Sequence, residues 1–273
     1  MIKNFGKKIG LFIDLDGTVY HGARMIPYAD QWIRNVRSEG IPFLFVTNNS
    51  SRTPVAVAQH LIGMGIEALP DEVYTSAQAA AQYVNEQQLG KDIFCIGEIG
   101  LRVALQEKGL SLSDCMDDSV DVVVQGIDRE FNYLKLEKAV TALLKGASFI
   151  QTNPDLLLPS DHGLIPGAGT LGASIQAGSR VKPVVIGKPS PIIMEYALAK
   201  LGCLPEQAIV IGDNMFTDIG AGRAAGCHTV LVLTGVTTSA NYDEQVQLAG
   251  FEPDHVCKDI EELSAYISLK NRL

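Results

Sequence analysis

The sequence predicts a doubly wound α/β fold, in which helices cover both faces of a parallel sheet. Short apolar runs, among them residues 9–13, 42–46 and 208–211, have the unbroken hydrophobicity of strands that are buried on both faces. Segments with apolar residues at helical spacing alternate with these runs. That alternation is typical of parallel strands joined by crossover helices.

Two helices are predicted in the first third of the chain. Over residues 28–39, apolar side chains recur at helical spacing, and Gly40 follows as a good stop. Residues 54–64 begin with Pro54, which suits a first helical turn. A short hairpin or loop is expected at residues 19–22, between the first strand and the first helix.

The middle of the chain has a β-α-β-α-β rhythm of its own and enough residues for a second core. The predicted helices are residues 74–87, 99–108 and 133–144, and the predicted strands are residues 92–96, 121–125 and 147–151. We therefore expect a core formed by residues 1–81 and 182–273, with residues 82–181 inserted as a smaller α/β domain. Residues 153–163 are expected to form a long, turn-rich loop.

The final third of the chain has the same alternation of predicted strands and helices as the first third. Strands are predicted at residues 183–186, 208–211 and 228–233, and helices at residues 192–201 and 218–225. These elements complete the doubly wound core.

Composition narrows the class of protein. The 273 residues are 47% hydrophobic, which is enough for a large core. The net charge of −9 does not favour a nucleic-acid-binding face. The five cysteines are scattered without a CxxC spacing, which fits reduced thiols. Neither a signal peptide nor a stretch of transmembrane length is expected. We therefore predict a cytoplasmic protein without membrane or nucleic-acid partners.

Polar residues follow four of the predicted strands. Because the carboxyl ends of parallel strands gather at one edge of a sheet, these residues are expected to lie together. The set combines carboxylates, hydroxyl and amide donors and one cation. That inventory suits phosphoryl transfer, in which catalysis depends on positioning and charge neutralisation. The residues are Asp14 and Asp16, Thr47 and Asn48, Lys188, and Asp213.

The first acidic pair indicates a cation. Asp14 and Asp16 are two residues apart, so an extended backbone points them to the same side. Two carboxylates that close repel each other unless a cation lies between them, and Mg²⁺ is a hard, oxygen-seeking ion of the right kind. Taken alone, the pair fits an ordinary turn equally well, since Asp and Gly17 are common turn residues.

The other polar residues also have ordinary explanations when each is taken singly. Thr47 and Asn48 fit a strand-to-helix loop with capping side chains. Lys188 fits a solvated lysine before a proline turn. Asp218 fits an acid favoured by the dipole at a helix N-terminus.

Taken in order, the motifs resemble the four signature motifs of the haloacid dehalogenase (HAD) superfamily. They are Asp14-x-Asp16-Gly17-Thr18, Thr47-Asn48, Lys188, and Gly212-Asp213 with Asp218. Their surroundings are similar to the NagD-like (p-nitrophenyl phosphatase) subfamily: Asp-Gly-Thr-Val-Tyr-His-Gly, Val-Thr-Asn-Asn-Ser and Gly-Lys-Pro-Ser-Pro. In that subfamily an α/β cap lies between the second and third motifs. The resemblance implies a Rossmann-like HAD core with the inserted domain as its cap.

The resemblance also implies catalytic roles. Asp14 would be the nucleophile that takes the phosphoryl group, since a carboxylate can form a labile acyl phosphate. Asp16 would be the general acid and then the general base, with its backbone carbonyl on the metal. Lys188 would pair with both the phosphate and Asp14.

Substrate and metal contacts are implied in the same way. Thr47 and Asn48 would hold phosphate oxygens together with Lys188, with Asn49 close by. Asp213 would bind Mg²⁺ directly and Asp218 would support it. The implied metal residues are Asp14, Asp16, Asp213 and Asp218.

The expected activity is Mg²⁺-dependent hydrolysis of phosphomonoesters of small metabolites, either sugar phosphates or nucleoside monophosphates, through an aspartyl phosphate. Residues 153–167 are expected to select the substrate, and caps of this kind often pair, so a homodimer through the cap is expected. The loop offers apolar residues 156–158 and the polar side chains of Asp155, Ser160, Asp161 and His162. An equal alternative is that the leucines of this loop pack the cap core.

Two other classes of protein share parts of this pattern. A receiver-like signalling domain also uses an acidic pair, a phosphorylated Asp, a Thr and a Lys, but it is much shorter and carries no inserted domain. A catalytically silent phosphate-binding protein would have kept the fold without turnover.

Overall fold

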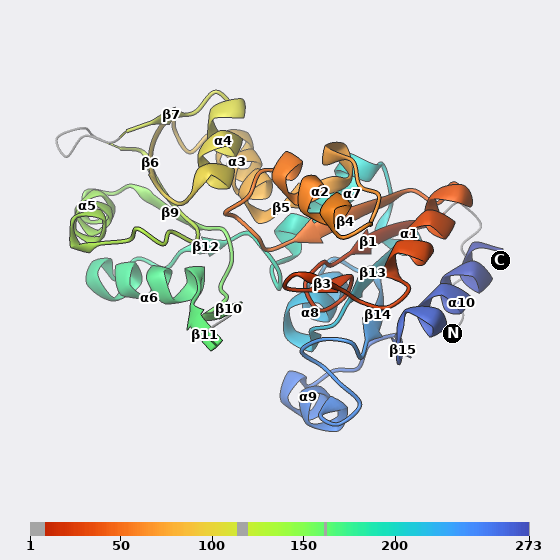
Figure 1. The fold of residues 1–273 in the computed structure, drawn as a ribbon. Helices are drawn as coiled ribbons and strands as arrows, with labels where there is room; N and C mark the ends of the chain where they lie inside the picture. Colours follow the sequence, from red (N-terminus) through yellow and green to blue (C-terminus); the bar gives the residue numbers. More distant parts are fainter. Residues whose placement is uncertain (1–8, 114–119, 161–162, 273) are drawn as a thin grey trace. The chain divides into compact units, whose positions relative to one another are not determined.

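The computed structural model describes residues 9–113, 120–160 and 163–272. The chain divides into two compact units (Figure 1). The first takes residues up to 47, residues 57–74 and residues from 188 onward, and the second takes residues 48–56 and 75–187.

The first unit is built on a six-stranded sheet of order β15-β14-β13-β1-β4-β5. From β15 to β4 every pairing is parallel. The chain fills one side of β1 with β4 and β5, then returns to fill the other side with β13, β14 and β15. The order therefore reverses between β1 and β13, which is where doubly wound sheets bind ligands. The strands are β1 (Gly10–Ile13), β4 (Phe43–Thr47), β5 (Val73–Thr75), β13 (Ala208–Gly212), β14 (His228–Val232) and β15 (His255–Cys257).

Helices cover both faces of this sheet. Alternate strand residues such as Leu11 and Ile13 pack with Trp32, Leu61 and Leu263 in one large core. These three come from α1 (Ala29–Ser38), α2 (Pro54–Gly63) and α10 (Ile260–Asn271). Toward the opposite face, α7 (Pro191–Leu201) contacts β4, and α8 (Gly220–Ala224) contacts β14. Also in this unit are α9 (Tyr242–Ala249), the hairpin β2 (Tyr20–His21) and β3 (Arg24–Met25), and the 3₁₀ turns η1 (Pro70–Glu72) and η2 (Pro205–Gln207).

The second unit has its own sheet of order β12-β9-β8-β6-β7, with every pairing parallel. α5 (Tyr133–Leu144) and α6 (Ala168–Ser179) pack on one face around Phe94, Val123 and Phe149. α3 (Ser76–Glu86) and α4 (Ile99–Glu107) pack together on the other side (Figure 1). The strands are β6 (Asp92–Ile96), β7 (Ser111–Leu112), β8 (Val122–Gln125), β9 (Ser148–Gln151) and β12 (Val184–Val185).

The predicted helix at 74–87 begins too early. Its first residues belong to β5, and Thr75 is the N-cap of α3. The backbone N–H of Gln78 donates to Thr75 Oγ1 at 3.2 Å, and the backbone N–H of Thr75 donates to Gln78 Oε1 at 3.0 Å. This reciprocal cap fixes the helix start. A domain boundary at residue 82 would fall inside α3, and the predicted bounds of the inserted domain stay a prediction.

The turn-rich loop predicted at 153–163 is in part an antiparallel hairpin. β10 (Leu157–Ser160) pairs with β11 (Gly163–Pro166). Leu156 and Leu157 are more than half exposed, so they do not pack a core within this unit. Asp161 and His162 lie outside the described residues.

The helix predicted at 218–225 also begins elsewhere. Asn214 is the N-cap, because its Oδ1 accepts from the backbone N–H of Phe216 at 2.9 Å. A π-helical turn, η3 (Met215–Ile219), then leads into α8. Within the part of the chain that the structure describes, helices fall short of the length and hydropathy that crossing a bilayer requires.

Candidate active site

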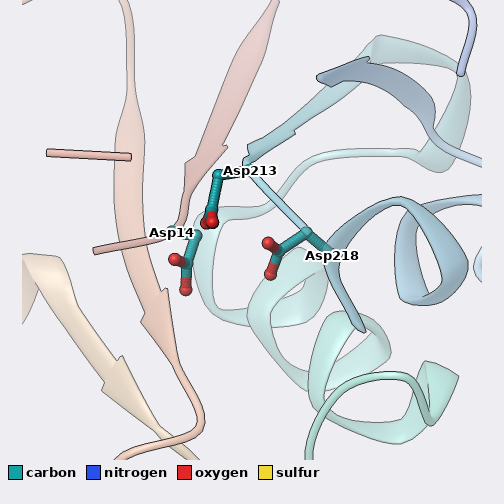
Figure 2. Close-up of side chains that lie close together, drawn as sticks. All are labelled: Asp14, Asp213 and Asp218. Carbon is teal, nitrogen blue, oxygen red and sulfur yellow. The ribbon is translucent and has the colours of Figure 1, made fainter. Parts of the chain in front are cut away.

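Three carboxylates meet at the switch point of the first unit (Figure 2). Asp14 follows β1, Asp213 follows β13, and Asp218 projects from η3. One oxygen from each lies within 4.8 Å of the others. Asp213 and Asp218 are 2% exposed, and the side chain of Asp14 is 13% exposed. The parallel pairing of Ile13 with Ile211 brings the two strand ends together.

Lys188 lies inside this acidic cluster. Its Nζ is 2.5 Å from Asp14 Oδ1 and 2.6 Å from Asp218 Oδ1, and it donates to the carbonyl of Val46 at 3.0 Å. Burial opposes protonation of the ammonium, but the charges of Asp14 and Asp218 raise the pKa of Lys188 above its ordinary value. The lysine is therefore a fixed, buried cation, and the alternative of a solvated lysine is excluded.

When its three carboxyl groups are ionised, the cluster holds more negative than positive charge. Burial and then the neighbouring charge of Asp218 raise the pKa of Asp14 well above its usual value. The same two causes raise the pKa of Asp213 to about 7. One ammonium does not balance three buried carboxylates, so the cluster would gain from a further cation. Buried carboxylate oxygens are the donors that a hard divalent ion prefers, and in this sense the residues fit Mg²⁺.

Close backbone approach makes the cluster possible. A side chain at Gly212 would put its Cβ 2.3 Å from the Cβ of Asp218. At Gly17 it would lie 2.3 Å from Asp213 Oδ2, and Gly17 also has a φ of 90°, which disfavours other residues. These two glycines, which belong to the motifs in the sequence, let the turns after β1 and β13 lie against the acids.

Asp218 combines the two explanations that the sequence offers. It lies in the first turn of η3, where its Oδ2 accepts from the backbone N–H of Asn214 at 3.1 Å. Its other oxygen pairs with Lys188. Asp218 is therefore both a helix-terminal acid and a member of the charged cluster.

Asp16 lies apart from the cluster. It is exposed and forms an isolated bridge with Tyr20 in the turn after β1. Partial burial of its carboxyl raises the pKa of Asp16. Its side chain is not one of the three that converge. The approach of its backbone carbonyl to a metal stays a prediction.

The predicted phosphate contacts are divided between the units. Thr47 ends β4 in the first unit and is buried. Asn48 and Asn49 belong to the second unit. The Asn48 side chain donates to Asp155 Oδ2 at 3.1 Å, and Asn49 Oδ1 accepts from the backbone N–H of Ser51 at 2.9 Å. The Asn49 contact is an ordinary turn bond, while a role of either residue toward phosphate stays a prediction.

Sequence reasoning overlooked the segment of residues 234–237. Val236 donates its backbone N–H to Asp213 Oδ2 at 2.6 Å. Thr18, which the motif contains but to which no role was assigned, donates its hydroxyl to Asp213 Oδ1 at 3.3 Å. The position of residues 234–237, directly after a predicted strand, was the one available signal. Backbone donors have no residue signature.

The comparisons with known proteins agree with this arrangement. A haloacid dehalogenase-like hydrolase model matches residues 11–111, and a HAD-hydrolase-like model matches residues 185–263. The 5'-nucleotidase YutF of Bacillus subtilis is 41% identical over 258 residues, which cover 94% of this chain and 98% of the relative. The acid sugar phosphatase of Staphylococcus aureus is 43% identical over 253 residues, which cover 93% and 95% of the two chains.

Solved structures show the same fold along the chain. The p-nitrophenyl phosphatase from Archaeoglobus fulgidus matches with a TM-score of 0.89 and 34% identity, covering 95% of this chain and 99% of that one. NagD from E. coli K-12 matches with a TM-score of 0.85 and 32% identity, covering 93% and 97%. The predicted fold class, family resemblance and enzyme class are confirmed. The chain belongs to the haloacid dehalogenase-like hydrolase family and is a phosphatase of its NagD type.

Proposed function

We propose that this phosphatase hydrolyses phosphomonoesters of small metabolites, sugar phosphates or nucleoside monophosphates, with Mg²⁺ and through an aspartyl phosphate on Asp14. The observation that carries the proposal is the buried contact of 2.5 Å between Lys188 Nζ and Asp14 Oδ1 inside a cluster of acids. This contact favours the ionised form of Asp14 against the opposing effects of burial and of Asp218, and it would hold the carboxylate in one orientation.

In the first half of the reaction, Asp14 is the nucleophile. An oxygen of its carboxylate attacks the phosphorus, and the bond from phosphorus to the ester oxygen breaks. The leaving oxygen takes a proton from Asp16, whose raised pKa favours the protonated form that this step needs. The products of this half-reaction are the free alcohol and the aspartyl phosphate.

The second half restores the enzyme. Asp16, now ionised, takes a proton from water, whose oxygen attacks the phosphorus. The bond between phosphorus and Asp14 breaks, and inorganic phosphate leaves. Lys188 stays protonated throughout and offsets the negative charge of the phosphoryl group.

The metal would be held by the same edge of the sheet. Asp14 and Asp213 would offer carboxylate oxygens, Asp218 would support them, and Asp16 would offer its backbone carbonyl. When bound, Mg²⁺ would offset charge on the phosphoryl oxygens and help to align them. We keep Thr47, Asn48 and Asn49 as proposed donors to the phosphate.

The substrate class rests on the relatives. One is named a 5'-nucleotidase and another an acid sugar phosphatase, and both names describe enzymes that act on small phosphomonoesters. We propose that residues 82–181 form the substrate-selecting cap, in which the exposed Leu156 and Leu157 offer an apolar surface. A cytoplasmic location and a homodimer through this cap stay predictions of the sequence.

The test is turnover of p-nitrophenyl phosphate by the purified protein. We expect nitrophenol release with Mg²⁺, its loss in EDTA, and loss of several orders of magnitude in Asp14→Asn. Asp92→Asn is the matched control, because Asp92 is an exposed residue at the start of β6 in the second unit. Equal release in all four samples would refute the mechanism.

A panel of phosphometabolites would then decide between sugar phosphates and nucleoside monophosphates. Phosphate retained on the protein without turnover would instead favour the receiver-like alternative. Tight binding of a phosphorylated ligand by a protein without any activity would favour the silent binder.

A further inference from the structure

The segment of residues 234–237 lies directly against Asp213. It follows β14 and has the sequence Thr-Gly-Val-Thr. The backbone N–H of Val236 donates to Asp213 Oδ2 at 2.6 Å, and the backbone N–H of Thr237 donates to the Asp213 carbonyl at 3.0 Å. Since Thr18 donates to Asp213 Oδ1, both oxygens of this carboxylate accept a hydrogen bond.

Because Gly235 has no side chain, the segment can lie close to Asp213 and Gly17. A Cβ at this position would lie 2.0 Å from Asp213 Oδ2 and 2.7 Å from the Cα of Gly17. Gly235 does not have a left-handed φ, so another residue could adopt its backbone conformation. The requirement for glycine here is therefore one of space beside Asp213 and not one of backbone strain.

Thr234 ties the same segment to the turn after β1. Its Oγ1 donates to the carbonyl of Gly17 at 2.7 Å. Its own carbonyl lies 2.5 Å from the ring Nε2 of His21, in the hairpin that follows that turn. The segment thus contacts the strand ends on both sides of the switch point, one through Gly17 and the other through Asp213.

We propose that residues 234–237 are a positioning segment that sets the affinity of the acidic cluster for Mg²⁺ by holding Asp213 in one orientation. The inference rests on the proposed function, in which Asp213 binds the metal. Hydrogen bonds to a carboxylate from fixed N–H groups are strong and directional. Groups that orient a metal ligand typically change metal affinity by about 10- to 100-fold when they are altered. Substitutions at Gly235 and Thr234 can test this role of the segment.

The main experiment titrates Mg²⁺ into the full-length protein and follows binding by calorimetry, beside the unfolding temperature in EDTA. In Gly235→Ala the added Cβ must displace Asp213 or the segment, so we expect Mg²⁺ to bind about 10- to 100-fold more weakly. Activity should recover in part when Mg²⁺ is raised. The control is Gly63→Ala, because Gly63 in α2 has open space around it and no left-handed φ. Its Mg²⁺ affinity should equal that of the unmodified protein.

A milder pair of variants decides the matter if Gly235→Ala does not fold. Thr234→Val keeps the shape of the side chain and removes the hydroxyl that donates to Gly17, while Thr234→Ser keeps the hydroxyl. We expect several-fold weaker Mg²⁺ binding in Thr234→Val and near-normal binding in Thr234→Ser. A purely structural role would lower the unfolding temperature in EDTA and leave the Mg²⁺ affinity unchanged.

The outcomes separate this inference from the proposed function. If the unmodified protein does not bind Mg²⁺, the proposed metal site itself fails. If the unmodified protein binds Mg²⁺ and the folded variants bind it equally well, the positioning role of residues 234–237 is overturned and the metal site stands.

Discussion

The two sheets of this protein share one architecture and differ in the polar groups at the carboxyl ends of their strands. In the first unit, the residues at this edge include the charged groups Asp14, Asp213 and the nearby Lys188. In the second unit, Gln125 ends β8 and Gln151 ends β9, and both are buried neutral amides. Parallel pairing in each unit places polar groups at one edge, so topology alone does not distinguish the two edges.

The partners of these polar groups explain the difference. In the second unit the side chains of Gln125 and Gln151 both donate to the carbonyl of Ala168, at 3.0 and 3.3 Å. A Cβ at Gly172 would lie 2.4 Å from Gln151 Nε2, so α6 packs directly on these amides. The amides at the carboxyl ends of β8 and β9 therefore hold α6 against the sheet of the second unit. The first edge keeps an excess of buried charge, and such charge is costly unless a ligand or metal offsets it. We infer that chemistry resides at the first edge for this reason.

The largest loss of stability and activity is expected from removing Lys188, the buried cation of the acidic cluster. Lys188→Met leaves Asp14 and Asp218 without their shared partner, and breaking a buried ion pair costs about 3–5 kcal/mol of the free energy of unfolding. Activity should fall by several orders of magnitude. Lys135→Met is the matched control, because Lys135 pairs with Asp128 in the second unit at 2.8 Å and is partly exposed. It should lower the free energy of unfolding less than Lys188→Met does, because the Lys135 side chain is 31% exposed and that of Lys188 only 4%, and it should leave activity intact.

Urea unfolding with p-nitrophenyl phosphate assays measures both changes. Equal losses of stability in the two lysine variants would break the distinction between the edges.

A smaller effect is expected from placing a charge at the second edge. Gln151→Glu puts a carboxyl beside buried amides and the packed helix α6. Burial should raise the pKa of the introduced carboxyl above its unfolded value of about 4.3. The folded state then holds its proton more tightly than the unfolded state does, so stability is retained at low pH. It is lost as the pH rises from about 4.3 through the folded pKa.

The free energy of unfolding of Gln151→Glu, measured at several pH values, checks this sign. Gln151→Met, which introduces no charge, serves as the comparison and should show no added pH dependence. A pH-independent loss in Gln151→Glu would show that charge is tolerated at the second edge and would weaken the comparison.

The smallest effect is expected at the opposite, amino-terminal edge of the first sheet. His255 begins β15 and stacks on Tyr266, with ring centroids 3.7 Å apart. Burial lowers the pKa of His255, partly offset by Glu262. The unfolded state therefore binds the proton more readily, and stability should fall slightly as the pH drops below about 6.5. NMR titration of His255 measures its pKa directly, and His255→Asn should remove this part of the pH dependence. A pKa at or above the ordinary value would contradict the expectation.

Much of the charged edge could be predicted from the sequence. Strand-end carboxylates after apolar runs pointed to Asp14 and Asp213, and the order of the motifs pointed to Lys188 and Asp218. The hydrogen bond that Val236 donates to Asp213 could not be predicted, because it comes from the backbone N–H and the Val236 side chain carries no signal. Hairpin residue Leu157 was ambiguous for a different reason: an apolar side chain in a loop reveals neither its exposure nor its packing.

The helices and strands, too, could be predicted from the sequence only in part. Long amphipathic helices such as Tyr133–Leu144 were predicted to the residue. β5 was merged into the helix that follows it, since its three residues are too few to show a strand pattern. α6, α9, α10 and β15 were not predicted, because small residues in α6 and weak patterning near the C-terminus gave no clear periodicity.

The most direct test of the account is to quench the enzyme with acid during turnover of a phosphomonoester with Mg²⁺ and to locate phosphate by peptide mass spectrometry. We expect a labile phosphoryl group on Asp14, absent in EDTA and in Asp14→Asn. Steady turnover with the phosphoryl group on another residue, or turnover that persists unchanged in Asp14→Asn, would contradict it.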